Sequence, residues 1–129
     1  MAIIGSHHIA LVSPNFERTK QFYTETLGFP IVGQILNSPV VFIDIGGTTI
    51  ELGPAREGAQ VASGSTGLTH LAFEVDDVDA TYRDLVAKGV SFHIEPRDAK
   101  DMRIAFFRDP DGNALELFHC DRLSWAKKA

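Results

Sequence analysis

The sequence predicts an α+β protein made of two tandem βαβββ modules, and three observations support this prediction. A pattern of one strand, one helix and three strands occurs in residues 6–53 and again in residues 68–119. A stretch rich in Gly, Ser, Ala and Thr, residues 54–67, separates the two patterns as a linker would. The chain has 129 residues, which suits one domain and is too short for two independent cores. We therefore expect a single domain with a C-terminal tail at residues 120–129.

The composition indicates a globular protein that acts on small molecules. Hydrophobic residues make up 44% and charged residues 22% of the chain, close to the average for folded domains. The net charge of −5, with no basic run longer than Lys127-Lys128, argues against nucleic acid and anionic membranes as partners. No basic start followed by an apolar stretch and no 18-residue apolar segment occurs, so we expect a cytoplasmic protein. Cys120 is the only cysteine, and we expect it to be structural.

In the first module, β-rich residues 8–12 predict a strand that ends at Ser13-Pro14-Asn15, where proline and capping residues open a helix. Apolar residues at helical spacing predict that this helix runs over residues 16–27, and Gly28 stands where a left-handed C-cap belongs. Three strands are predicted after it, at residues 29–34, 40–45 and 48–52.

The second module repeats this order. Residues 69–75 predict a strand, and Asp76-Asp77 can cap a helix whose apolar stripe begins at Val78 and which ends at Gly89. Three further strands are predicted at residues 90–94, 104–107 and 114–118, the last two joined by the turn sequence at 109–113.

Polar residues and glycines of the two modules fall in register, which indicates a duplication. The pairs His8 and His70, Gly28 and Gly89, and Glu51 and Glu116 are separated by 62, 61 and 65 residues.

Two carboxylates interrupt strands that otherwise read as buried. Glu51 stands between Ile50 and Leu52, and Glu116 stands between two leucines. Since side chains alternate along a strand, each Glu is expected to face away from its apolar neighbours. If the sheet curls, both carboxylates can converge with His8 and His70, which are expected to open the first strand of each module.

Such a cluster needs a cation, because two nearby carboxylates repel and burying an unpaired charge costs several kcal/mol. We therefore predict that His8, Glu51, His70 and Glu116 bind one divalent metal ion. His7 is expected on the face opposite His8 if the strand is regular, and His93 and His119 have no partner in the repeat. These three histidines are predicted to be structural.

These residues resemble the vicinal oxygen chelate superfamily, which includes glyoxalase I, methylmalonyl-CoA epimerase, extradiol dioxygenases, and fosfomycin and bleomycin resistance proteins. The resemblance lies in five motifs: His8-Ile9-Ala10-Leu11, Phe22-Tyr23 with Leu27-Gly28-Phe29, Ile50-Glu51-Leu52, His70-Leu71-Ala72-Phe73-Glu74-Val75-Asp76-Asp77, and Asp109-Pro110-Asp111-Gly112-Asn113-Ala114-Leu115-Glu116-Leu117. It implies a U-shaped sheet of eight strands around a metal held by His8, Glu51, His70 and Glu116. It also implies a homodimer and a small-molecule substrate bound through vicinal oxygens. Zinc, nickel, cobalt, manganese and ferrous iron all suit these ligands.

The leading functional prediction is a glyoxalase I-like lyase or isomerase that acts through a metal-stabilised enediolate or enolate. By this resemblance Glu116 is the catalytic base, and Glu51 is a ligand or second base. The chain departs from the glutathione-dependent pattern at Val12, where glyoxalase I commonly has an arginine.

Four alternatives remain open. A methylmalonyl-CoA epimerase would usually have glutamine in place of Glu51, whereas a fosfomycin-type transferase or a ring-cleaving dioxygenase would use three protein ligands and leave Glu51 over. A bleomycin resistance-like binding protein would generally lack the metal residues. The substrate, the metal, and the use of glutathione or CoA stay undetermined, as does whether one chain or two complete the site.

Overall fold

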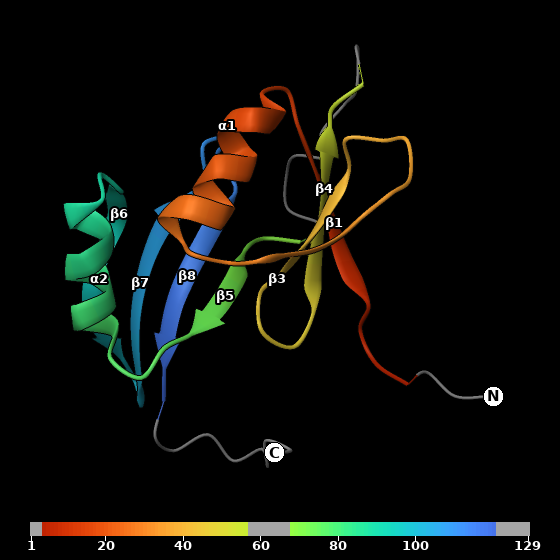
Figure 1. Ribbon diagram of the computed structural model, residues 1–129. Coiled ribbons are helices and arrows are strands. Elements are labelled where there is room, and N and C mark those ends of the chain that lie inside the picture. The colour runs from red at the N-terminus through yellow and green to blue at the C-terminus, as the bar shows by residue number, and fades with distance from the viewer. Residues whose placement is uncertain (1–3, 57–67, 121–129) are drawn as a thin grey trace. The chain divides into compact units, whose positions relative to one another are not determined.

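The computed structural model describes residues 4–56 and 68–120 and divides the chain into two compact units, Met1–Gly64 and Ser65–Ala129 (Figure 1). We call these units the first and the second module. Each holds one βαβββ pattern, which confirms the predicted α+β class and the tandem arrangement. Their union in one domain and one U-shaped sheet stays a prediction. Most of the linker, residues 57–67, and the tail, residues 121–129, lie outside the described residues. No helix in the described ranges is long and apolar enough to cross a membrane.

The first module is a four-stranded mixed sheet with one helical segment. Its elements are β1 (His8–Ser13), α1 (Phe16–Gln21), the π-helix η1 (Phe22–Thr26), β2 (Ile31–Gln34), β3 (Val41–Asp44) and β4 (Thr49–Pro54). The strand order is β1-β4-β3-β2, with β1 parallel to β4 and the other pairs antiparallel. The first and last strands of the module are therefore neighbours.

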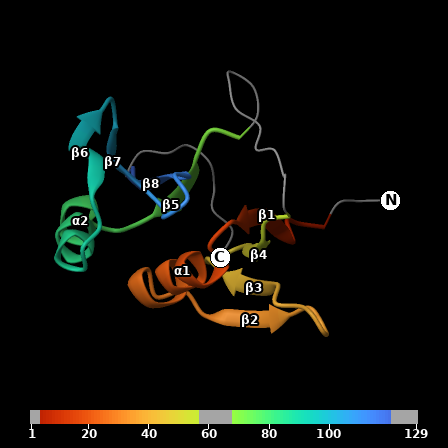
Figure 2. The ribbon, with the colours of Figure 1, turned by 90° about the horizontal axis from the view of Figure 1, so that it is seen from above.

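The second module has the same topology. Its elements are β5 (Leu71–Glu74), α2 (Val78–Ala87), β6 (Phe92–Ala99), β7 (Met102–Arg108) and β8 (Ala114–His119). The order is β5-β8-β7-β6, with β5 parallel to β8. Helix α1 contacts β1 and β4, and α2 contacts β6, β7 and β8, so each helix lies against its own sheet (Figure 2).

The core of each module is built from alternate residues of its last strand. Ile50 and Leu52 of β4 are fully buried, and Leu115 and Leu117 of β8 are nearly so. Each such side chain contributes roughly 1.5–3 kcal/mol through its removal from water. Because residues alternate between the two faces of a strand, the residue between each apolar pair faces away from the core.

The first helix ends differently from the prediction. The sequence predicts one helix over residues 16–27, whereas the α-helix stops at Gln21 and a π-helical turn follows, in which the Leu27 amide donates to the Phe22 carbonyl at 2.9 Å. The Thr24 hydroxyl donates to the Lys20 carbonyl at 2.7 Å, and such a side-chain bond competes with the regular ladder. The predicted left-handed glycine is found at Gly28, whose φ is 83°.

Two strand boundaries also differ from the prediction. Strand β6 continues to Ala99, although Glu95-Pro96 was expected to end it at Ile94. The register shifts between Ile94 and Arg97, and β6 is an edge strand, so proline removes no ladder hydrogen bond from a central position. His70 does not open β5 as predicted, because pairing with β8 begins at Leu71.

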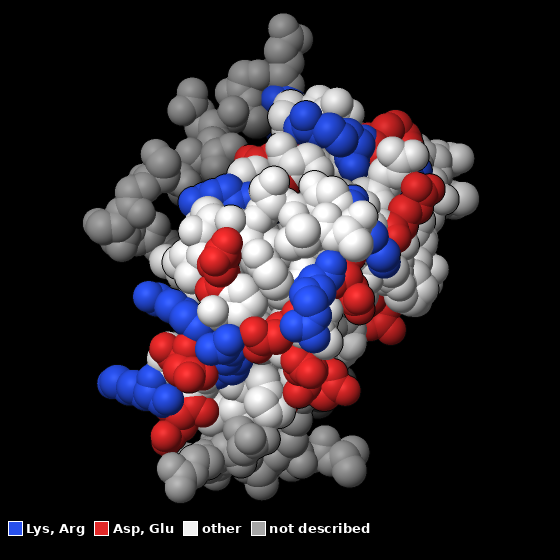
Figure 3. Space-filling model, turned by 90° about the vertical axis from the view of Figure 1, so that its left-hand side faces the viewer, with Lys and Arg blue, Asp and Glu red and all other residues white. Residues whose placement is uncertain are grey.

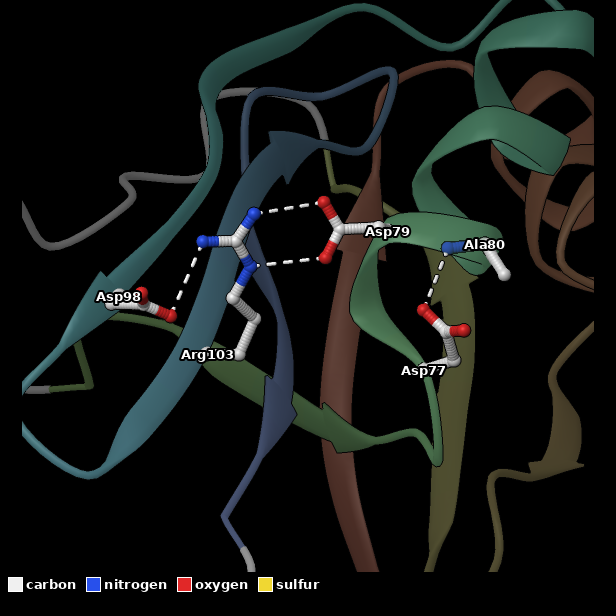
Figure 4. Close-up of polar contacts among 5 residues, drawn as sticks. All are labelled: Asp77, Asp79, Ala80, Asp98 and Arg103. Carbon is white, nitrogen blue, oxygen red and sulfur yellow. Dashed lines mark hydrogen bonds and ion pairs between the residues drawn. The ribbon is translucent and has the colours of Figure 1, made fainter.

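A polar cluster joins α2 to the sheet of the second module (Figure 4). Asp77 caps the helix as predicted, with its carboxylate accepting a hydrogen bond from the Ala80 amide at 3.0 Å. Arg103 of β7 donates to both oxygens of Asp79, at 2.8 and 3.0 Å, and to Asp98 of β6 at 3.2 Å. The hydrogen bond from Arg103 lowers the pKa of Asp79. Arg103 thus has a structural role and is not free to meet an anionic substrate.

Charges of both signs are mixed on the described surface. On the face drawn in Figure 3, Lys and Arg side chains alternate with Asp and Glu side chains, and no broad area carries a single sign. This pattern offers no electrostatic footprint for a polyanion on that face.

Candidate metal centre

The first module brings His8 and Glu51 together. In the parallel pairing of β1 with β4, Ala10 lies opposite Glu51, so these two residues face the same side. His8 stands two residues before Ala10 and therefore shares that side. As a result His8 Nε2 lies 3.3 Å from Glu51 Oε2.

The second module brings His70 and Glu116 together by the same register. Ala72 of β5 lies opposite Glu116 of β8, and His70 precedes Ala72 by two residues. His70 Nε2 lies 3.1 Å from Glu116 Oε1. The structure thus pairs the four predicted residues two by two, one pair in each module.

A phenylalanine contacts the histidine in both pairs. Phe42 of β3 lies opposite Glu51 in the sheet, and Phe106 of β7 lies opposite Glu116. The His8 and Phe42 rings meet edge-on with centroids 5.6 Å apart, and the His70 and Phe106 rings do so at 5.3 Å. The sequence analysis missed these phenylalanines, although their separation of 64 residues falls within the offsets of the duplication.

Burial differs between the two carboxylates. The side chain of Glu51 is 28% exposed and that of Glu116 only 10%. Burial raises the pKa of Glu116, and the neighbouring His70 opposes that rise. An ionised Glu116 is therefore costly in the metal-free protein, and a cation beside it would remove that cost.

The spacing within each pair fits two ligands of one metal ion. Nitrogen and oxygen ligands lie about 2.1 Å from such an ion, so two adjacent ligands are about 3.0 Å apart at a right angle and about 3.4 Å apart at a tetrahedral angle. The observed 3.3 and 3.1 Å fall inside that window. Each pair also suits a direct hydrogen bond, so the donor set fits both states.

In the described residues, 4–56 and 68–120, no group of three or more His, Cys, Asp or Glu side chains that could hold an ion is found. Each module by itself thus supplies two protein ligands. The joining of both pairs in one four-ligand centre stays a prediction.

His7 does not take the place that strand alternation predicted. It stands before the first residue of β1, so alternation does not constrain it, and its ring lies beside His8 with the two Nδ1 atoms 2.8 Å apart. His7 also contacts the Phe42 ring at 6.0 Å. His119 Nδ1 lies 3.0 Å from the Val75 carbonyl oxygen, and the His93 ring contacts Phe106 at 6.1 Å.

A family model described as Glyoxalase/Bleomycin resistance protein/Dioxygenase superfamily matches residues 5–117. The chain belongs to this superfamily. The uncharacterized protein YraH of Bacillus subtilis is 35% identical over 122 residues, covering 85% of this chain and 94% of YraH. The metallothiol transferase FosB of Staphylococcus epidermidis is 28% identical, covering 91% of this chain and 82% of FosB. The lactoylglutathione lyase of Schizosaccharomyces pombe is 38% identical over 66 residues, covering 48% of this chain and 22% of the lyase.

Solved structures share the fold over most of the chain. TnmS3, an antibiotic binding protein from Streptomyces sp. CB03234, has a TM-score of 0.74 at 28% identity and covers 91% of this chain and 96% of its own. A glyoxalase family protein from Enterococcus faecalis has a TM-score of 0.72 at 30% identity and covers 92% of this chain and 100% of its own. The superfamily therefore holds enzymes as well as binding proteins on one fold, and the site must decide between them.

Proposed function

We propose that this protein is a divalent-metal-dependent lyase or isomerase, similar to glyoxalase I, that acts on a small carbonyl or thioester substrate. The observation that carries the proposal is the repeated His–Glu pair, with nitrogen-to-oxygen distances of 3.3 and 3.1 Å that suit adjacent ligands of one ion. The four side chains would hold the ion, from one chain or from two chains of a homodimer, and leave coordination positions open for substrate.

A bound divalent ion would supply Lewis-acid chemistry, which polarises a carbonyl and acidifies the neighbouring C–H bond. Glu116 would take that proton, since it is the more buried carboxylate and burial raises its pKa. A base with a raised pKa holds an abstracted proton better than an ordinary glutamate does. Glu51, the more exposed carboxylate, would serve as a ligand or second base.

Turnover of the hemithioacetal of methylglyoxal and glutathione tests this proposal. The protein is stripped of metal and reloaded in turn with nickel, zinc, cobalt and manganese, and product is followed for the wild type, Glu116→Gln and Glu95→Gln. Glu95 is an exposed strand carboxylate of the second module and serves as the matched control. We expect turnover with at least one metal, its loss in Glu116→Gln, and wild-type rates in Glu95→Gln. No turnover with any metal removes the hemithioacetal as substrate.

Exchange of deuterium into methylmalonyl-CoA, measured in the same loaded samples, covers the epimerase reaction. Exchange without hemithioacetal turnover would move the proposal to a CoA thioester while keeping Glu116 as the base.

A thiol transferase is the second candidate, because the match to the metallothiol transferase FosB spans 91% of this chain whereas the match to lactoylglutathione lyase spans 48%. Glu51 distinguishes the two activities. By the family resemblance a fosfomycin-type transferase needs three ligands, which correspond to His8, His70 and Glu116. If Glu51→Gln keeps its metal and adds a thiol to fosfomycin, the transferase is favoured. If Glu51→Gln loses both metal and lyase activity, the lyase is favoured.

Ligand binding without catalysis is favoured by one observation, the similarity to the antibiotic binding protein TnmS3. Such a protein needs no metal. Elemental analysis of the purified chain separates the two classes, because a bound transition metal supports an enzyme and a metal-free chain that binds an antibiotic supports the binding protein.

A further inference from the structure

We propose that His7 and Thr69 are positioning residues, each of which holds the neighbouring metal-binding histidine through its Nδ1 atom. The inference rests on the proposed metal centre and deepens it, because it assigns residues that orient His8 and His70 toward the ion. Neither His7 nor Thr69 would touch the metal.

In the second module, the two ring nitrogens of His70 have different neighbours. Nδ1 lies 3.0 Å from the hydroxyl oxygen of Thr69, and Nε2 lies 3.1 Å from Glu116 Oε1. The imidazole therefore spans the space between a hydroxyl and a carboxylate, with the nitrogen beside the carboxylate available as the ligand.

The first module has the same arrangement with a different residue. His8 Nδ1 lies 2.8 Å from His7 Nδ1, and His8 Nε2 lies 3.3 Å from Glu51 Oε2. Positions 7 and 69 are 62 residues apart, the same offset as that between His8 and His70. An imidazole in one copy and a hydroxyl in the other share one property, a hydrogen-bonding atom next to Nδ1.

The chemistry of a neutral imidazole explains why that atom matters. The ring carries one proton, and a nitrogen that donates its lone pair to a metal leaves the proton on the other nitrogen. If Nε2 binds the ion, Nδ1–H needs an acceptor, which the Thr69 hydroxyl oxygen can provide. His7 Nδ1 can also accept when the proton of that ring is on its own Nε2.

Ring contacts add a second restraint on each imidazole. Phe42 meets the rings of both His7 and His8 edge-on, at 6.0 and 5.6 Å, and Phe106 meets His70 at 5.3 Å. Edge-on aromatic contacts limit the tilt of a ring, and the bond at Nδ1 limits its rotation. Together they fix the direction in which Nε2 points.

Metal affinity tests the role of both residues. His7 and Thr69 are exposed, where water competes for Nδ1–H, so we expect Thr69→Val and His7→Phe each to weaken binding by about tenfold, the lower end of the range for such outer-shell partners. Thr69→Ser and His7→Asn keep a hydrogen-bonding atom and should bind zinc within about twofold of the wild type. Thr81→Val, which removes a helix hydroxyl bonded to the Asp77 carbonyl, is the matched control and should also bind like the wild type.

Nitrogen chemical shifts of the histidine rings test the same inference in the wild type, where no substitution can disturb folding. In the zinc-loaded protein we expect His8 and His70 to bind zinc through Nε2 and to carry the proton on Nδ1.

Coordination through Nδ1, or unchanged zinc affinity in both Thr69→Val and His7→Phe, would overturn the positioning role while leaving the metal centre in place. A wild-type protein that takes up no zinc, nickel, cobalt or manganese would instead remove the proposed function, and this inference with it.

Discussion

Glu116 illustrates at the scale of single residues how a functional group can oppose stability. Its carboxylate lies in β8 between two core leucines and is 10% exposed, with His70 as its neighbour. Burial is the largest influence on its pKa and raises it from the ordinary value of 4.5. The folded protein therefore favours the protonated form, and its ionised form reduces stability when no cation is present.

This conflict predicts opposite effects of Glu116→Gln on stability and on metal binding. At neutral pH the metal-free variant should unfold at a higher temperature than the metal-free wild type, because it carries no buried charge. Zinc affinity should fall by more than about 100-fold, since even outer-shell partners account for 10–100-fold. Thermal melts with and without zinc measure both effects. A large loss of stability in the metal-free variant would show that Glu116 has a structural role instead.

The pH dependence of the same comparison has a definite sign. Because the folded pKa of Glu116 is raised, its contribution is fully present below the unfolded value of 4.5 and is lost as the pH rises through the folded value. Relative to Glu116→Gln, the metal-free wild type should lose stability from acidic to neutral pH. A stability difference that does not change with pH would contradict the assigned pKa shift.

The direction of single side chains was predictable only where strand alternation applies. Ile50 and Leu52 are buried and Glu51 faces the other side, as the alternation of apolar and acidic residues predicted. His7 escaped prediction because it stands before β1, where the path of the chain sets its direction. Phe42 was missed because its contact with His8 depends on the register between β3 and β4, which the sequence does not state.

The link between α2 and its sheet belongs to the scale of secondary-structure elements. Arg103 makes a two-point contact with Asp79 in the first turn of α2, which joins the helix to β7. The side chains are 33% and 41% exposed, so water and salt weaken the pair. Two-point geometry is nevertheless the arrangement in which an exposed ion pair contributes measurably.

We expect Asp79→Asn and Arg103→Met to lower the urea midpoint slightly and by similar amounts, with the double variant no less stable than either single one. The pKa of Asp79 is lowered, so its contribution is present above the model value of 3.8 and is lost as the pH falls through the folded value. The difference between the wild type and Asp79→Asn should therefore vanish in strong acid. Asp98→Asn removes the more exposed partner of Arg103 and should have a smaller effect. Additive losses in the double variant would show that the pair does not act as a unit.

The order of elements was readable from the sequence because punctuation and periodicity agree. Asn15 and Asp77 cap the two helices, and Gly28 and Gly89 have the positive φ expected after them. The extension of β6 past Pro96 was not readable, because it depends on a register shift and on the edge position of that strand.

At the scale of the whole molecule, the duplication divides the candidate site into two halves. Each module folds the same topology and produces one His–Glu pair, with a phenylalanine beside the histidine. Two ligands hold a divalent ion weakly, whereas four ligands suit a resident metal with positions left for substrate. The sequence predicted all four residues because their offsets match, but offsets carry no information on how the two modules pack or on whether a partner chain takes part.

Metal stoichiometry tests the central claim most directly, namely that both pairs share one ion. The wild type, His8→Ala and His70→Ala are dialysed against zinc, and the metal bound per chain is determined by elemental analysis. The account predicts one zinc per chain in the wild type and almost none in either variant, because each variant breaks one half of a shared centre. A wild type without metal, or variants that each keep the metal of the intact pair, would contradict it.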